Sequence, residues 1–248
     1  IHKELSYSEN MKIKKCVFRK NADYNALEIL VYTQVSSGSY NLIFQPIGLQ
    51  KIDIYKPYYL PYEKLDNYVK EKIGEKNGYS GGFIERFIVD DQSNVLVSLK
   101  KNVTGFDDDY ATSTNPELIG ISYFDINGKE INGWAYPYNA PNKEFLVFTN
   151  KTGKYILLNE DQKNFKKPLN EKRTAVKKVD ESCTVLLALK DNGEITQQYV
   201  FGEPKDKNES KRLAMDKIYY DAKTNTVIGY YYEGEGYKEK KLCFLTIE

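Results

Sequence analysis

The amino-acid sequence predicts an all-β domain that is built from repeated pairs of strands. The segment 89–102, VDDQSNVLVSLKKN, returns at 179–192 as VDESCTVLLALKDN, with seven residues unchanged. In both segments apolar residues recur with a period of two, which is typical of a β-strand. The chain also contains 22 Tyr in 248 residues, and Tyr favours strands and half-buried surfaces. These three observations indicate the all-β class.

Each copy of the repeated segment contains a turn that is followed by a strand. Asp90 and Asp180 precede the small or polar residues of the turn, where an Asp side chain can accept hydrogen bonds from backbone amides. The strand begins at Val95 in one copy and at Val185 in the other. One of its faces is strongly apolar and the other is small or apolar. This pattern is expected for a strand that neighbouring sheets cover on both sides.

Further segments show the same pattern of strand, turn and strand. A third copy is at 220–233, and looser copies are at 133–150 and 14–34. Each unit is followed by another apolar run, so third strands are expected at 40–48, 118–125, 154–160, 195–201 and 240–247. Between strands, Asn-Gly or Thr-Gly stands where a hairpin needs a positive φ, at 125–129, 150–154 and 190–194.

This organisation resembles that of the β-propellers, in which small sheets are arranged round an axis. The resemblance covers most of the chain and depends on architecture alone. The WD and Gly-His signature of one propeller class is absent. The segment FDINGKEINGW at 124–134 keeps Asp125, Gly128 and Trp134 of a sialidase-type box at the wrong spacing. The resemblance implies a single domain over 1–248 with five blades, or six if the first or last unit is split.

One insertion, at about 55–82, interrupts the strand pattern and predicts an amphipathic helix after Pro61. Gly74 is expected to end this helix. Its apolar face is expected to contain Tyr62, Leu65, Val69 and Ile73. We expect the helix to lie over an end of the domain as a cap.

Charge and composition argue against several classes of protein. Lys and Arg number 36 against 35 acidic residues, and only four of the basic residues are Arg, so nucleic-acid binding is not expected. The longest uncharged apolar runs have the length of strands, so no transmembrane segment is expected. The only His is His2, which argues against a Ser–His–Asp or Cys–His mechanism and against a multi-His zinc site. The three Cys are expected to be buried, with at most one disulfide.

Two aromatic segments form the predicted ligand-binding site. The segments 54–62, IYKPYYLPY, and 133–138, GWAYPY, interleave rings with Pro, which stiffens an extended backbone. Rigid, exposed rings suit the faces of sugars or extended peptides. The predicted ligand-binding residues are Trp134, Tyr136, Tyr138, Tyr58 and Tyr59. The alternative is that these rings pack the joint between the helix and the blades and supply the aromatic residues of strands.

No catalytic residue, metal ligand or cofactor is predicted. Asp107, Asp108 and Asp109 could contact a calcium ion, but three adjacent carboxylates cannot all face one ion, so a solvated loop is the expectation. A glycoside hydrolase would need only two carboxylates, and no motif selects a pair among the 35 acidic residues.

The expected function is therefore a non-catalytic binding or scaffold protein, with a glycan or a peptide as ligand, and a monomer is expected. The alternative is a glycoside hydrolase or another carbohydrate-active enzyme that uses paired carboxylates in a propeller cavity. The abundance of Lys, Asn, Ile and Tyr favours a bacterial source. The chain begins at Ile1 without a signal-type segment, so a leader was removed or the chain was trimmed. The expected location is the cell envelope or the exterior, and intracellular scaffolding is the third alternative.

Overall fold

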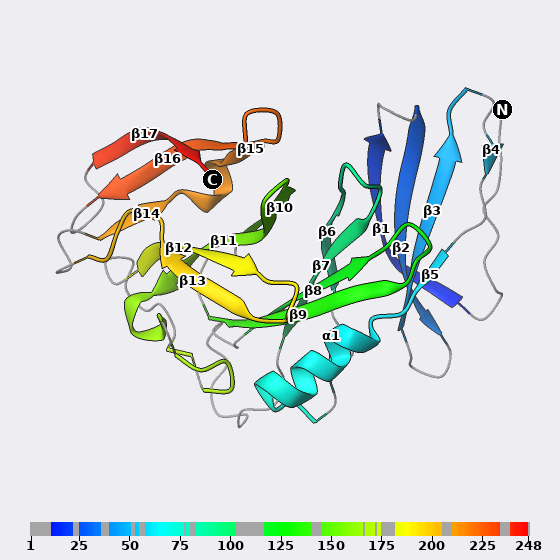
Figure 1. The fold of residues 1–248 in the computed structure, drawn as a ribbon, viewed down its shortest axis with the longest axis horizontal. Coiled ribbons are helices and arrows are strands. Elements are labelled where there is room, and N and C mark those ends of the chain that lie inside the picture. The colour runs from blue at the N-terminus through cyan, green and yellow to red at the C-terminus, as the bar shows by residue number, and fades with distance from the viewer. Residues whose placement is uncertain are drawn as a thin grey trace.

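The structure is a computed structural model of the chain. It describes residues 11–21, 25–35, 40–50, 53–54, 58–76, 78–79, 83–102, 117–139, 145–165, 167–171, 173–174, 182–204, 210–233 and 239–247. In these residues the strands form four antiparallel sheets, none of which closes into a barrel, and Figure 1 shows them one after another along the molecule. The all-β class is confirmed.

The first and second sheets come from the N-terminal half of the chain. The first sheet has the order β1-β2-β3-β4, with β5 also paired to β3, and the second has the order β6-β7-β8-β9. The bounds in the first sheet are β1 (Met11–Asn21), β2 (Ala26–Val35), β3 (Tyr40–Gly48), β4 (Asp53–Ile54) and β5 (Tyr58–Leu60). Those in the second are β6 (Phe83–Val89), β7 (Val95–Asn102), β8 (Glu117–Phe124) and β9 (Glu130–Tyr138).

The third and fourth sheets come from the C-terminal half. The third sheet has the order β10-β11-β12-β13, and in the fourth β16 pairs with β14, β15 and β17. The bounds in the third sheet are β10 (Phe145–Asn150), β11 (Gly153–Asp161), β12 (Ser182–Leu189) and β13 (Ile195–Tyr199). Those in the fourth are β14 (Lys211–Leu213), β15 (Tyr219–Asp221), β16 (Thr226–Glu233) and β17 (Glu239–Thr246).

The four sheets pack face to face in chain order, and this packing buries the core. Phe44 of β3 meets Phe87 of β6 edge-on, with ring centroids 6.4 Å apart, and joins the first sheet to the second. The indole of Trp134 on β9 bonds to the turn after β12 and joins the second sheet to the third. Asn159 of β11 donates a hydrogen bond of 2.8 Å to the carbonyl of Leu213 on β14 and joins the third sheet to the fourth. In the second and third sheets, apolar side chains on both faces of the sheet are therefore buried against a neighbouring sheet.

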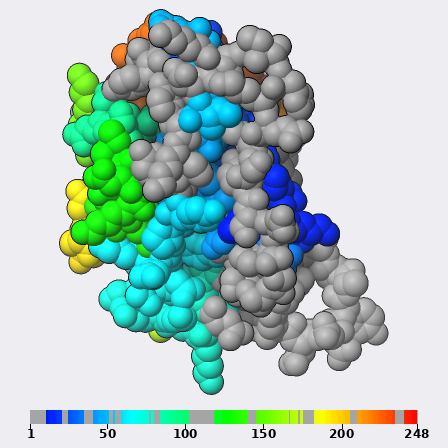
Figure 2. Space-filling model, turned by 90° about the vertical axis from the view of Figure 1, so that its right-hand side faces the viewer, coloured from blue at the N-terminus to red at the C-terminus, as the bar shows by residue number. Residues whose placement is uncertain are grey.

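The predicted helix is confirmed as α1 (Glu63–Tyr68), which continues as a π-helical turn over Val69–Ile73. Gly74 ends it with a φ of 87°, a left-handed conformation that favours glycine. The four residues predicted on its apolar face are buried or pack against the core. Figure 2 shows α1 (cyan) at the surface of the molecule, beside the green residues of the second sheet.

The helix lies directly on the backbone of β8 and β9, because two positions there lack a side chain. A Cβ atom added at Gly133 would lie 2.2 Å from the backbone nitrogen of Leu65, and one added at Gly120 would lie 2.6 Å from the ring of Tyr79. The carboxylate of Glu130 on β9 accepts hydrogen bonds from the backbone amides at the start of α1. Small residues and one buried acid therefore fix the helix to the second sheet.

The two copies of the repeated segment occupy different positions in their sheets. Val95 begins β7, the second strand of the second sheet, whereas Val185 lies in β12, the third strand of the third sheet. The segment 133–150, taken as one strand pair in the sequence, joins β9 of the second sheet to β10 of the third. The predicted count of five units is therefore not confirmed: the described strands form four sheets. The turn chemistry is confirmed at Asp90, whose Oδ1 accepts hydrogen bonds from the amides of Gln92 and Asn94.

Candidate functional site

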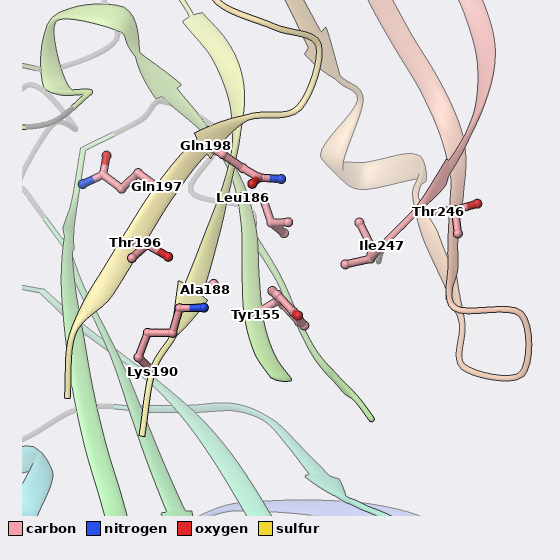
Figure 3. A pocket seen from close by; sticks show the side chains of 9 residues that line it. All are labelled: Tyr155, Leu186, Ala188, Lys190, Thr196, Gln197, Gln198, Thr246 and Ile247. Atoms are coloured by element: carbon pink, nitrogen blue, oxygen red, sulfur yellow. The ribbon is translucent and has the colours of Figure 1, made fainter. Parts of the chain in front are cut away.

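A pocket of about 510 Å³ lies between the third sheet and the end of the fourth. Figure 3 shows its two walls, one formed by β11, β12 and β13 and the other by the end of β17. The residues that line it are Tyr155, Leu186, Ala188, Lys190, Thr196, Gln197, Gln198, Thr246 and Ile247. This volume lies within the range of about 300–1,000 Å³ that is usual for ligand pockets.

The register of the third sheet places the wall residues on one face. Ala188 of β12 is opposite Thr196 of β13 and also opposite Tyr155 of β11. Leu186 is opposite Gln198. Because residues two apart on a strand share a face, all five side chains lie on the face that is turned to the fourth sheet. The side chain of Gln197 points the other way, as Figure 3 shows.

Three apolar side chains, which are almost fully buried, form the floor of the pocket. Tyr155, Leu186 and Ile247 are buried. The hydroxyl of Tyr155 lies 2.9 Å from that of Thr152, and its ring stacks on Phe148 with centroids 5.3 Å apart. The Tyr155 side chain is thus contacted at its hydroxyl and on one face of its ring.

The rim of the pocket carries polar groups that can still accept or donate hydrogen bonds. Within the part of the chain that the structure describes, the side chains of Thr196, Gln198 and Lys190 make no hydrogen bond or ion pair. Thr246 also borders the pocket, but its side chain points away from it, on the face of β17 opposite to that of Leu245 and Ile247. An amide and a hydroxyl each both donate and accept, so these groups match a ligand with many hydroxyls. No carboxylate is among the residues that line this pocket.

Three of the predicted ligand-binding residues are buried between the second and third sheets. Trp134 and Tyr136 are 0 % exposed and Tyr138 is 2 % exposed. The indole N–H of Trp134 donates to the carbonyl of Lys190 at 3.0 Å, and the hydroxyl of Tyr136 lies 3.1 Å from Oε2 of Glu160. They pack as strand aromatics between two sheets, which is one part of the alternative that the sequence left open, and their ligand-binding role stays a prediction.

The other two predicted residues lie in β5 of the first sheet. The ring of Tyr59 is half exposed, on the face turned away from the second sheet. The side chain of Tyr58 is outside the described residues. The structure therefore does not bring Tyr59 together with the buried rings of β9.

A buried polar cluster surrounds Glu160 at the end of β11. Its carboxylate accepts hydrogen bonds from the side-chain amide of Asn164 at 2.7 Å and from the backbone amide of Asp161 at 3.0 Å. The guanidinium of Arg173 lies 5.0 Å from the ring centre of Tyr136, on the side of this cluster. Burial raises the pKa of Glu160 to about 7, against the opposing effect of these hydrogen bonds and of Arg173. Glu160 is fully buried, and it lines neither of the two pockets that are described for this structure.

A smaller cavity, of about 160 Å³, lies between the first and second sheets. It is lined by two carboxylates, those of Glu28 and Asp125. Oδ1 of Asp125 already accepts hydrogen bonds from the amides of Asn127 and Lys129, which close the turn between β8 and β9. The volume is below the usual range for ligand pockets. This cavity thus fits a structural role for Asp125.

Other candidates from the sequence were located as far as the structure describes them. Cys16, Cys183 and Cys243 are free thiols, and burial raises the pKa of Cys183 to about 12. The described residues contain no cluster of three or more His, Cys, Asp or Glu suited to a metal ion. None of their helices has the length and apolar character needed to cross a membrane. His2 and the loop with Asp107, Asp108 and Asp109 lie outside the described residues.

The pocket between the third and fourth sheets was not predicted from the sequence. Its free polar groups, Lys190 after β12 and Thr196 and Gln198 from β13, form no motif, and the wall opposite them comes from β17, far along the chain. The only signal was the polar alternation in ITQQY at 195–199, which marks a strand with one open face. Neither the protein-family models nor the curated proteins with which the sequence was compared include a match.

Proposed function

We propose that the protein is a non-catalytic glycan-binding protein and that its ligand occupies the pocket between the third and fourth sheets. The observation that carries this proposal is the set of free amide and hydroxyl groups of Thr196 and Gln198 on a wall whose exposed surface is mostly polar. These groups would bond to sugar hydroxyls, and the ammonium group of Lys190 would add a further donor. A mostly polar pocket of this kind suits a ligand with many hydroxyls.

Binding is favoured over hydrolysis by the chemistry of the lining. A glycoside hydrolase of the usual kind needs two carboxyl groups on either side of the scissile bond. The residues that line the large pocket include no Asp or Glu. The two carboxylates of the smaller cavity, Glu28 and Asp125, line a volume of about 160 Å³, which is small for a glycan.

We also propose that the four sheets are blades of a β-propeller. Each of the first three sheets runs in chain order from an inner strand to an outer one, as blades do. The inner strands β1, β6 and β10 are neighbours, with β6 in contact with both others. In Figure 1 the sheets spread away from this side of the molecule. A bacterial cell envelope or exterior as location is part of the proposal and is supported by composition alone.

The test is a glycan array of plant and bacterial oligosaccharides, followed by calorimetric titration with the oligosaccharide that binds best. We expect Gln198→Ala and Thr196→Ala each to weaken binding about tenfold, because each removes a hydrogen bond to the ligand. Gln197→Ala is the matched control, since the neighbouring amide points away from the pocket. Binding to no oligosaccharide on the array, or equal affinities for wild type and Gln198→Ala, would exclude this site.

A further inference from the structure

The outer face of the fourth sheet carries an unusual number of exposed apolar side chains. We call the face that is turned away from the third sheet the outer face. On it Tyr219 is 65 % exposed, Phe244 64 %, Leu242 55 % and Tyr230 39 %. Most other large exposed apolar residues that the structure describes are single, or lie on the outer face of the first sheet.

The register of the fourth sheet places these four residues in one patch. Tyr219 of β15 is opposite Ile228 of β16, which is opposite Phe244 of β17. Two residues along, Tyr230 of β16 is opposite Leu242 of β17. The intervening residues point to the third sheet, and they include Val227, Cys243 and Leu245. We call the outer set the apolar patch.

Strands that are apolar on both faces are typical of sheets that are covered on both sides. A sheet that faces water normally has polar residues on its outer face. Three aromatic rings and one Leu at these exposures present about 400 Å² of apolar surface, a size at which patches are commonly functional. Aromatic residues and Arg are also enriched at the centre of protein interfaces, which is more apolar than the rest of the surface.

The outer face of the first sheet does not offer a matching open surface. Its middle row, Ile29, Val31 and Ile43, is already buried. Only its margin is exposed, at residues such as Phe18. A head-to-tail contact between the first and fourth sheets of two copies would therefore lack an open apolar plane on one side.

We propose that the apolar patch on the fourth sheet binds the same patch of a second copy of this chain, which gives a two-fold symmetric dimer. Contacts between identical patches close at two copies and are the commonest arrangement among soluble oligomers. A standard interface covers about 800 Å² on each partner, of which the apolar patch supplies about half and the polar rim the rest. This proposal differs from the monomer expected from the sequence and does not depend on the glycan pocket.

The charges at the two ends of the patch are complementary under two-fold symmetry. At one end Arg212 and Lys240 lie on the outer face, over the rings of Tyr232 and Tyr230. At the other end Asp221 shares the face, opposite Thr226. A two-fold axis in the contact plane and perpendicular to β16 reverses the strand direction. This rotation brings Asp221 of each copy to the cationic end of the other copy. The charges therefore favour an antiparallel arrangement of the two β16 strands over a parallel arrangement.

The test is the mass of the purified chain in solution, measured by sedimentation equilibrium and by light scattering after gel filtration over a range of concentrations. We expect twice the 28.7 kDa of one chain. Phe244→Glu and Leu242→Glu should each raise the dissociation constant by about 100-fold, because each would bury an unpaired charge at the centre of the contact. Their circular dichroism spectra and melting temperatures at low concentration should equal those of the wild-type monomer.

Phe18→Glu is the matched control. Phe18 is an equally exposed ring, 61 % against 64 % for Phe244, and lies on the outer face of the first sheet. It should leave the dimer unchanged. A wild-type chain that sediments at 28.7 kDa at every concentration, or a dimer that survives both Phe244→Glu and Leu242→Glu, overturns the proposal. Dissociation by Phe18→Glu would also overturn it, in favour of a head-to-tail contact.

Discussion

The carboxylate of Glu130 accepts a hydrogen bond of 2.6 Å from the backbone amide of Lys64, although 66 positions separate the two residues in the chain. The same carboxylate also accepts from the amide of Leu65 and from the hydroxyl of Ser122. It satisfies amides that the start of a helix leaves without an intrahelical partner. Burial raises the pKa of Glu130 above its ordinary value, and the hydrogen bonds oppose that rise.

We expect Glu130→Ala to lower the free energy of unfolding by about 2–3 kcal/mol, because it leaves buried amides and a hydroxyl without an acceptor. Urea denaturation followed by circular dichroism measures this change. Glu85→Ala, at an exposed position of β6, is the control and should change the free energy by less than about 0.5 kcal/mol. Equal stability of the two variants would show that Glu130 does not hold the helix.

A substitution at Gly133 is a second test of the contact between the helix and β9. We expect Gly133→Ala to destabilise the protein by about 3 kcal/mol, because the added Cβ would meet the backbone of Leu65 at 2.2 Å. In the control, Gly153→Ala, the nearest atom is the hydroxyl of Tyr155 at 3.0 Å, which would have to shift by only a few tenths of an ångström, so a loss of about 1 kcal/mol is expected. Thermal melts of both variants give the comparison. A Gly133→Ala protein as stable as Gly153→Ala contradicts the close contact.

The stability of the fold should depend on the protonation of Glu160. Its pKa in the folded protein is about 7, against an ordinary value of 4.5, so the folded state binds the proton more tightly than the unfolded state. Its contribution to stability is therefore fully present below pH 4.5 and is lost as the pH rises to 7. The loss is about 3 kcal/mol at about 1.4 kcal/mol for each pKa unit.

Glu160→Gln removes this titration and keeps the shape of the side chain. We expect wild type to lose stability relative to Glu160→Gln between pH 4.5 and pH 7, with little further change above pH 7. Urea denaturation at a series of pH values measures the difference in the free energy of unfolding between the two proteins. The contributions of the other titrating groups cancel in this difference. A difference that does not vary with pH would mean that burial does not raise this pKa.

The rings predicted to bind ligand should instead affect stability when they are removed. We expect Trp134→Ala and Tyr136→Ala each to cost about 3–5 kcal/mol, because each leaves a cavity between the second and third sheets. Tyr59→Ala, which removes a half-exposed ring, should cost less than about 0.5 kcal/mol. Trp134 is the only Trp of the chain, so its emission in wild type reports the opening of this interface in chemical denaturation. Full stability of the Trp134→Ala variant, measured by circular dichroism, would be inconsistent with this packing role.

Much of the local structure could be predicted from the sequence, because it depends on neighbouring residues. The third strands expected at 118–125 and 240–247 are β8 and β17. The turns that contain Gly128 and Gly193 have the expected positive φ, whereas Gly153 in the turn at 150–154 does not. The helix was predicted from the period of its apolar residues, and Gly74 ends it as expected.

The arrangement of the strands was harder to predict, because similar environments select similar sequences. β7 and β12 are both central strands that are covered on two sides, so both need alternating apolar residues after a tight turn. The two segments are similar because they share this environment. They do not occupy equivalent positions in successive sheets. The pocket depends on which strands become neighbours across two sheets, and no short segment contains that information.

The hydrogen bonds from the start of α1 to Glu130 of β9 also have a consequence for folding during synthesis. During synthesis Lys64 is added long before Glu130, because the two residues are 66 positions apart in the chain. Until Glu130 has emerged from the ribosome, the helix lacks the carboxylate that accepts hydrogen bonds from its first amides. It also lacks Gly133, on whose backbone it packs. A helix of this length is only marginally stable alone. The helical segment of the nascent chain should therefore remain unfolded and accessible to chaperones until the hairpin of β8 and β9 has left the exit tunnel.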